Sequence, residues 1–243
     1  MTSPCEFRPA RFVEALSACQ TSYDVLGVLK DVCSAFGYSG FIAFRLPWLT
    51  DNTLSGRIIV TNWAPELIRA CNSLGFLSES PVIARLRRST LPFAADLADI
   101  AAAGDDEKRK TARDAFREHG HVNGVFLPCC DRDGRRGAVG FTGDETMAAT
   151  EELAELSYLA AHVYERLAHV AGAAFAEQSK LTVREKECIV WTAEGKTSAE
   201  AAQILGLSEN TVNHYLASAA GKLGTVNKAH TVARAISGGL LSD

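Results

Sequence analysis

The sequence lacks a hydrophobic run long enough to cross a membrane. Its longest stretch without a charged residue, Val32–Phe44, has 13 residues, whereas a membrane-spanning helix needs about 20 mostly apolar residues. The first residues carry charges at Glu6, Arg8, Arg11 and Glu14 and contain no apolar segment typical of a secretory signal. We therefore expect a cytoplasmic protein without membrane contacts.

The sequence also lacks the regular cysteine spacing of a disulfide framework or a zinc site. The 7 cysteines are odd in number and irregularly spaced, with no Cys-x-x-Cys pair, so the sequence does not indicate a disulfide framework. We expect a reducing compartment in which thiols serve mostly as small apolar side chains. The spacing of His119, His121, Cys129 and Cys130 matches no standard metal site, and we expect no metal or cofactor. Oxidation sensing by the vicinal Cys129 and Cys130 is an open alternative.

Motifs of common enzymes are missing as well. No Gly-x-Ser-x-Gly, His-Glu-x-x-His or Walker sequence occurs, and Gly134, Gly137 and Gly140 lack the helix that a phosphate-binding turn requires. We therefore predict that the protein is not an enzyme.

The chain has no excess of positive charge. Its 25 Lys and Arg residues face 29 Asp and Glu residues, a net charge of −4. Taken over the whole chain, this balance argues against a nucleic-acid partner, because phosphate neutralisation depends on Lys and Arg. The 47% apolar and 22% charged residues are typical of a globular protein, and 243 residues allow one large or two unequal domains.

The first 170 residues mix helical and strand patterns. Apolar residues from Val25 to Phe36 recur at helical spacing before Gly37, and the turn at Asp131–Gly134 separates two strand-like segments. The pattern predicts an α+β domain, an α-β-α sandwich with an antiparallel sheet. Its helices are expected at 25–36, 65–74, 105–119 and 149–170, and its strands at 41–46, 57–61, 122–130 and 135–142.

The last of these helices, 149–170, carries a heptad-like seam with apolar residues spaced 3-4-3-4-3. Such a seam is typical of a helix that packs on its own sheet, and also of a dimer interface. Both interpretations stay open from the pattern. The candidate dimerisation residues are Leu153, Leu156, Ala160, Val163 and Leu167.

A change in composition marks a domain boundary. Residues 171–179 are small and patternless, and no strand pattern follows Lys180. We therefore predict an α+β domain at 1–170, a linker at 171–179 and a small all-α domain at 180–243.

The C-terminal segment carries start and stop signals for four helices. Thr182 and Thr197 each stand three residues before a glutamate in a capping box, and Ser208 caps a longer helix that Gly224 ends. A short helix, a turn at Gly206 and a longer helix predict a helix-turn-helix, whose second helix reads the DNA major groove. A helical bundle without nucleic acid is the alternative. The candidate DNA-binding residues are Lys196, Thr197, Ser198, Glu209, Asn210, Thr211, Asn213, His214, Ser218 and Lys222, among which Asn can make bidentate contacts to adenine.

These residues also match a family. The segment Leu181-Thr-Val-Arg-Glu-Lys-Glu-Cys-Ile-Val-Trp-Thr-Ala-Glu-Gly, followed by Leu207-Ser-Glu-Asn-Thr-Val-Asn and Lys222-Leu-Gly, resembles the LuxR/GerE-type DNA-binding domain. Where the family usually has Arg or another polar residue, this chain has Ala220 and Gly221. The resemblance therefore implies moderate, salt-sensitive DNA affinity that depends on dimerisation.

The order of the two domains resembles the quorum-sensing branch of that family, which binds N-acyl-homoserine lactones. This resemblance implies that residues 1–170 form an autoinducer-binding-like sensor and dimerisation domain and that residues 180–243 form the DNA-binding domain. The family's lactone-binding Trp, its Tyr and its amide-binding Asp fall on Leu67, Cys71 and Ser80. The aromatic under the lactone falls on Ala95, and a Ser or Thr near the acyl carbonyl falls on Gly140. The predicted pocket residues are Trp63, Leu67, Cys71, Ser80, Val82, Ala95 and Gly140.

These replacements predict weak binding of ordinary lactones, because each unmet buried polar group costs about 1–3 kcal/mol. Three interpretations stay open: another ligand fills the freed space, the chain's own side chains fill it, or a lactone binds in an altered pose. We predict a dimeric LuxR-type transcriptional regulator whose partners are double-stranded DNA, a second copy and a small apolar or amphipathic signal molecule. The alternative is an antiactivator that heterodimerises with a related regulator.

Overall fold

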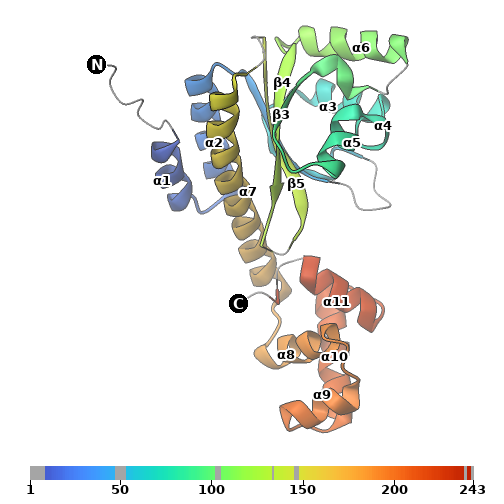
Figure 1. The fold of residues 1–243 in the computed structure, drawn as a ribbon. Coiled ribbons are helices and arrows are strands. Elements are labelled where there is room, and N and C mark those ends of the chain that lie inside the picture. Colours follow the sequence, from blue (N-terminus) through green and yellow to red (C-terminus); the bar gives the residue numbers. More distant parts are fainter. Residues whose placement is uncertain are drawn as a thin grey trace. The chain divides into compact units, whose positions relative to one another are not determined.

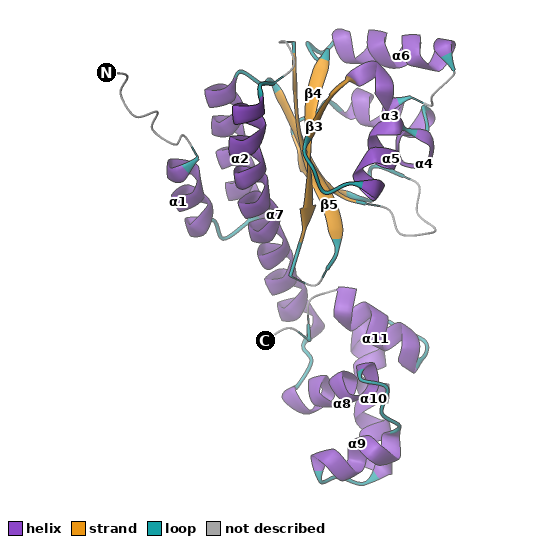
Figure 2. Cartoon of the chain, viewed as in Figure 1, coloured by secondary structure: helices purple, strands orange, loops and turns teal. Residues whose placement is uncertain are grey.

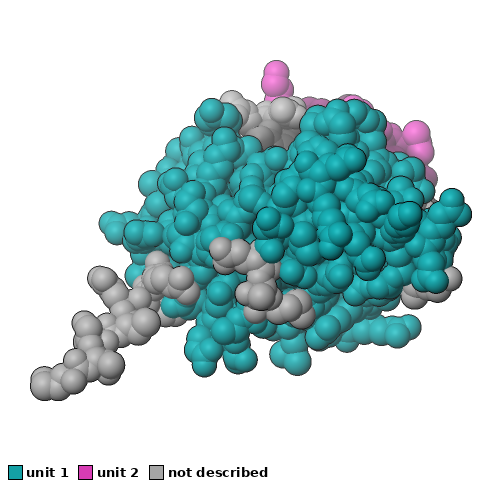
Figure 3. Space-filling model, turned by 90° about the horizontal axis from the view of Figure 1, so that it is seen from above, with its two compact units in different colours: residues 1–168 teal, residues 169–243 magenta. Residues whose placement is uncertain are grey.

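A computed structural model describes residues 9–46, 53–101, 105–132, 134–144, 148–237 and 240–241, with side chains except at 172–179 and 237. The chain divides into two compact units, Met1–Ala168 and His169–Asp243 (Figure 3). No helix among the described residues is both long and apolar enough to span a bilayer.

The first unit is built on a five-stranded antiparallel sheet with the order β2-β1-β5-β4-β3. The predicted hairpin is present, and Gly134 adopts a left-handed φ of 76° between its strands. Side chains alternate between the two faces of the sheet, so each long strand contributes to two separate cores. The strands are β1 (Gly40–Arg45), β2 (Ile58–Thr61), β3 (Phe93–Asp96), β4 (Asn123–Cys130) and β5 (Arg136–Gly143).

One face of the sheet is covered by α1 (Ala10–Ala18), α2 (Ser22–Phe36) and α7 (Thr150–Ser179), as Figure 1 shows. Thr21 and Asp24 form a capping box that opens α2. The first core, under these helices, contains Phe12, Leu29, Phe41, Val139, Phe141, Leu156, Val163 and Tyr164.

The other face is covered by short helices (Figure 2). They are α3 (Pro65–Ser73), α4 (Phe76–Glu79), α5 (Pro81–Arg88), the 3-10 turn η1 (Leu97–Ile100) and α6 (Asp106–Arg117). The second core, beneath them, includes Ile42, Phe44, Leu67, Phe76, Val82, Phe93 and Phe126. The predicted α-β-α sandwich is thereby confirmed.

After the end of α7, the second unit contains α8 (Val183–Ala193), α9 (Ser198–Leu205), α10 (Glu209–Leu223) and α11 (Lys228–Ser237). Both predicted capping boxes are formed, and Gly206 and Gly224 take left-handed conformations at the ends of α9 and α10. The all-α domain predicted from these signals is therefore confirmed.

Residues 171–179 differ from the prediction. The helix expected at 149–170 was predicted to end before them, but α7 continues to Ser179. Four of these nine residues are alanine, which has a high helix propensity, and the single Gly172 does not end the helix. The placement of the functional boundary near Lys180 stays a prediction.

Candidate ligand pocket and DNA-binding surface

A buried carboxylate organises the interior of the second unit. Glu185 closes the capping box with Thr182, and its side chain is only 3% exposed. Its Oε1 accepts a hydrogen bond from Ser218 Oγ at 2.6 Å, and its Oε2 accepts one from Lys222 Nζ at 2.7 Å. Lys222 Nζ also donates to the Lys180 carbonyl oxygen at 3.1 Å. The network ties the start of α8 to the last turns of α10.

Two predicted DNA contacts, Ser218 and Lys222, belong to this network. Both side chains bond Glu185 inside their own domain, and their contact with DNA stays a prediction. Burial alone would raise the pKa of Glu185, yet the hydrogen bonds from Lys222, Ser218 and Thr182 lower it to about 2. Glu185 is therefore ionised at neutral pH and neutralises the single basic side chain of α10.

The other predicted DNA contacts lie on α10 or near the first turn of α9. Lys196, Glu209, Asn210 and His214 are exposed. Thr197 is committed to capping α9, and the Thr211 hydroxyl is 2.8 Å from that of Ser208, so the structural role of these two hydroxyls is to secure helix ends. Their contact with DNA stays a prediction.

Asn213 belongs to a polar cluster that the sequence analysis missed. Its Oδ1 accepts hydrogen bonds from Ser198 Oγ at 2.8 Å and from Lys228 Nζ at 3.0 Å, and Lys228 Nζ donates to Ser198 Oγ at 2.7 Å. We call these three residues the Ser198–Asn213–Lys228 cluster. The sequence signal for Lys228 was its place directly after Asn227, whose Oδ1 caps α11 by accepting from His230 N.

The predicted pocket residues lie on the side of the sheet that holds the second core. Trp63, Leu67, Cys71, Ser80 and Val82 are each less than 5% exposed. Ala95, on β3, is partly buried against the same core. The positions that the resemblance assigns to a ligand thus lie beside one core, and a ligand pocket at these residues stays a prediction.

The polar groups in this region are already bonded within the chain. Ser80 Oγ donates to the Asp99 carbonyl oxygen at 3.0 Å and accepts from Val82 N at 3.2 Å, and it thereby caps α5. Trp63 Nε1 donates to Thr142 Oγ1 at 3.1 Å. Of the five buried pocket residues, Ser80 and Trp63 carry the polar side chains other than the thiol of Cys71, and both are used structurally.

Thr142 continues this polar chain to a buried histidine. Its Oγ1 lies 3.5 Å from His121 Nδ1, which is also 3.1 Å from Ser39 Oγ. Burial lowers the pKa of His121, and the nearby His119 lowers it further, whereas Asp144 acts in the opposite direction. His121 is therefore uncharged at neutral pH.

Gly140 does not leave free space, which favours the interpretation that the chain's own side chains fill this position. A Cβ at this position would lie 3.2 Å from Ile42 Cγ2 and from two ring carbons of Phe126. Phe126 stacks on Phe93 with ring centroids 5.7 Å apart. Aromatic and aliphatic side chains of this chain thus occupy the volume that a larger residue at 140 would take.

Two different protein families match the two parts of the chain. Residues 21–167 match the autoinducer binding domain family, and residues 179–235 match the bacterial regulatory proteins of the luxR family. The chain belongs to the LuxR family. It is 31% identical over 193 residues to transcriptional activator protein AhyR of Aeromonas hydrophila, with 76% of this chain and 74% of that protein covered. It is 25% identical over 228 residues to BjaR1 of Bradyrhizobium diazoefficiens, with 93% and 92% covered.

The fold of this LuxR-family chain is similar to that of SdiA. The complex of SdiA with octanoyl-rac-glycerol superposes with a TM-score of 0.70 at 23% identity, with 100% of this chain and 99% of that chain covered. A second structure, of Escherichia coli SdiA, gives a TM-score of 0.68 at 22% identity, with 97% and 98% covered. The chain is a LuxR-type quorum-sensing transcriptional regulator with an autoinducer-binding domain, and its family consists of regulators rather than enzymes.

The heptad-like seam of this LuxR-type regulator lies inside its own first core. Leu156, Ala160, Val163 and Leu167 are fully buried, and Leu153 packs partly buried against the same core. The interpretation as a dimer interface is therefore wrong for these side chains, because a stripe facing the sheet has the same spacing as a coiled-coil seam. The exposed face of α7 instead carries Tyr158, whose ring centroid is 4.6 Å from that of His162.

The described part of the chain contains no group of three or more His, Cys, Asp or Glu that could hold a metal ion. The vicinal cysteines are split as strand alternation predicts: Cys129 is buried and Cys130 is exposed. Burial raises the pKa of the Cys129 thiol to about 12. A protonated, buried thiol is a poor redox centre.

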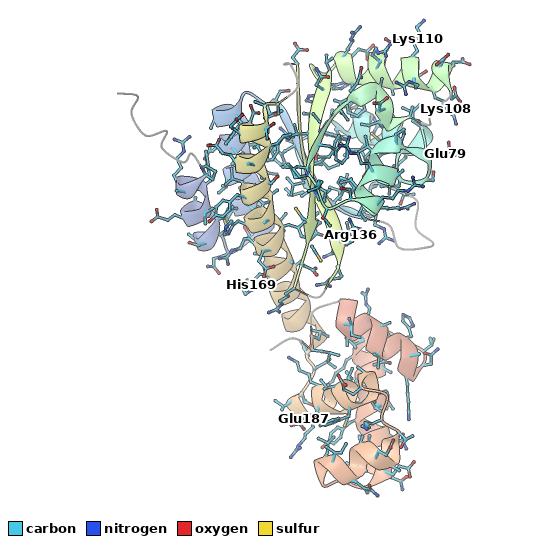
Figure 4. All side chains as sticks on the ribbon, in the orientation of Figure 1. Glu79, Lys108, Lys110, Arg136, His169 and Glu187 are labelled. Atoms are coloured by element: carbon cyan, nitrogen blue, oxygen red, sulfur yellow. The ribbon has the colours of Figure 1, made fainter. Side chains whose placement is uncertain are left out.

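Charged side chains on the first unit form local surface pairs (Figure 4). Lys108 Nζ lies 3.6 Å from Glu79 Oε2 and links α6 to α4, and Arg109 pairs with Asp99 at 2.7 Å. Arg136 donates from both terminal nitrogens to carbonyl oxygens of Leu86, Arg87 and Ser89 and so holds the end of α5. These contacts fix the short helices over the second core.

Proposed function

We propose that this chain is a dimeric LuxR-type regulator whose DNA binding does not require a standard N-acyl-homoserine lactone. It acts either without a ligand or with a less polar, apolar or amphipathic signal molecule. The observation that carries the proposal is Ser80, which stands where the family has its amide-binding Asp. Its hydroxyl already donates to Asp99 and accepts from Val82.

The energetic argument concerns the polar groups of a lactone. An acyl-homoserine lactone buries one amide N–H and two carbonyl oxygens, and each needs a partner in a dry pocket. Leu67 and Cys71 offer neither a hydroxyl nor an indole at the positions of the family's Trp and Tyr. Two or three missing partners weaken binding by roughly 3–6 kcal/mol, or about 10² to 10⁴-fold.

The proposal is tested by thermal denaturation with and without lactones of six- and twelve-carbon acyl chains at 100 µM. We expect a shift below about 1 °C, since a ligand stabilises only when its concentration exceeds its Kd. A parallel gel-shift on the DNA upstream of the chain's own gene should show specific binding without added ligand. Tight, saturable stabilisation by a lactone would refute the proposal and support a receptor with an altered binding pose.

The contact for a second copy is proposed on the exposed face of α7, opposite the buried seam. Tyr158 is 45% exposed there, and a two-fold dimer would present paired recognition helices to the half-sites of an approximate palindrome. Light scattering of Tyr158→Glu should give a monomer where the parent chain gives a dimer. An unchanged dimer for this variant would place the contact elsewhere.

The neutralised Lys222 supports one alternative function. With its ammonium held by Glu185, α10 presents no free basic side chain, as expected for an antiactivator that forms heterodimers with a related regulator. Absence of specific binding in the gel-shift, together with loss of binding by a co-expressed relative, would favour this alternative.

A further inference from the structure

The strongest unassigned feature is the Ser198–Asn213–Lys228 cluster, which joins three helices beside the first turns of the recognition helix α10. Ser198 is the first residue of α9, Asn213 lies on α10, and Lys228 is the first residue of α11. All three mutual contacts are within 3.0 Å. Side chains at the start of the second helix of a helix-turn-helix contact base edges, so Asn213 lies where operator sequence is read.

The chemistry of Lys228 fixes the orientation of the Asn213 amide. An ammonium group only donates hydrogen bonds, so the Asn213 atom facing Lys228 must be the carbonyl oxygen. That oxygen also accepts from Ser198. The Nδ2 amide group of Asn213 has no hydrogen-bond partner among the described residues, and it is not one of their buried atoms without a partner. Its two N–H donors are therefore available to a ligand.

Lys228 keeps a free positive charge, unlike Lys222. Within the described ranges, no carboxylate lies within ion-pair distance of Lys228 Nζ, whereas Lys222 Nζ is 2.7 Å from Glu185 Oε2. Two of the three ammonium donors of Lys228 bond Ser198 and Asn213. The third donor is available to a phosphate oxygen.

We propose that Ser198 and Lys228 hold Asn213 as a hydrogen-bond donor to the operator, and that Lys228 contacts the DNA backbone. The proposal rests on the DNA-binding function of the family. Bidentate recognition of adenine requires the Asn oxygen to accept from adenine N6, but this oxygen already accepts two bonds. The free N–H groups instead match acceptors in the major groove, above all N7, which adenine and guanine share. Guanine offers two such acceptors, N7 and O6, whereas adenine offers N7 beside a donor amine, so the base read by Asn213 is guanine in preference to adenine.

The test selects binding sites for the full chain from a pool of random 40-base-pair duplexes. The parent chain should enrich a site with one position where guanine is more frequent than adenine, and Asn213→Ala should lose this preference. Ser198→Ala with Lys228→Met frees the Asn213 oxygen, so this double variant should shift the same position to adenine by roughly fivefold or more.

A salt titration on the selected duplex tests the phosphate contact. Lys228→Met should reduce the slope of log K against log salt by about 0.9 for each bound protomer. Lys110→Met removes one charge from α6 of the other unit (Figure 4) and should leave the slope unchanged. Circular dichroism melting verifies that each variant is folded before it is compared.

Two results would overturn the proposal. A parent chain that selects adenine alone would show that the Asn213 oxygen is free to accept, and a Lys228→Met slope equal to that of the parent would remove Lys228 from the interface. Failure of the parent chain to enrich any sequence would instead count against ligand-independent DNA binding, so the two failures are distinguishable.

Discussion

Replacement of Lys222 by Met should selectively loosen the second unit. The pKa of Glu185 is lowered from 4.5 to about 2 in the folded chain. Because one pKa unit corresponds to about 1.4 kcal/mol, the donors outweigh the effect of burial and leave the ionised form favoured by a net amount on the order of 3 kcal/mol. Lys222 is the first of these donors, and its loss leaves a carboxylate that is 3% exposed without its counter-charge. We expect a cost of about 2 kcal/mol at pH 7.

Hydrogen exchange on the full chain is the appropriate assay, because it reports each unit separately. Amides of α8 and α10 in Lys222→Met should exchange roughly 30-fold faster than in the parent, while those of β4 and β5 should be unchanged. Lys186→Met is the matched control, since Lys186 lies on α8 and has no hydrogen bond or ion pair from its ammonium among the described residues.

The pH dependence of the exchange protection tests whether the Glu185–Lys222 ion pair stabilises the second unit. A depressed folded-state pKa means that the stabilisation is fully present above pH 4.5 and is lost as pH falls from 4.5 towards 2. The parent should lose protection of α8 and α10 over that window, and Lys222→Met should lose less. If both proteins show the same protection at pH 7 and the same acid profile, the ion pair does not stabilise this unit.

Three further predictions concern the first unit. Ser80→Ala removes the cap of α5 and the bond to Asp99, and urea unfolding should show a loss of about 1–2 kcal/mol. Burial depresses the pKa of His121, so stability should fall as pH drops below 6.5, and His121→Gln should flatten this decline between pH 7.5 and 5.5. The buried Tyr164 hydroxyl has no hydrogen-bond partner in the described structure, so Tyr164→Phe should leave the melting temperature unchanged or raise it, whereas a loss of several degrees would contradict this reasoning.

Local signals explain which parts of the fold were predictable. The capping boxes at Thr182 and Thr197 and the left-handed glycines act within four residues of their helix ends, so the sequence alone located α8, α9 and α10. Helix α1 was missed because its N-cap residue, Pro9, makes no side-chain cap. Strand β3 has four residues, which is too short for an alternation pattern to be recognised.

The site was less predictable because its contacts join residues that are distant in sequence. Lys222 was assigned to DNA as the one basic residue of α10, but its partner Glu185 is 37 residues away. The Asn213–Lys228 contact depends on how α10 and α11 pack. The apolar spacing of α7 is compatible both with packing on the chain's own sheet and with a dimer interface. The burial of Leu156 and Val163 against the sheet distinguishes the two.

The ion pairs also change how the charge of the chain bears on DNA binding. The net charge of −4 divides into −5 for residues 1–179 and +1 for residues 180–243. Within the second segment Glu185 neutralises Lys222, and Arg184 pairs with Glu187 at 2.8 Å. Lys196 and Lys228 are the two exposed lysines of this segment that we assign to DNA, and neither has an ion pair among the described residues. Two phosphate contacts per protomer give a salt slope of only about −1.8, whereas two protomers give about −3.6. A regulator with so few free cations depends on its second copy to hold DNA at physiological salt, so a measured slope near −1.8 would contradict dimeric binding.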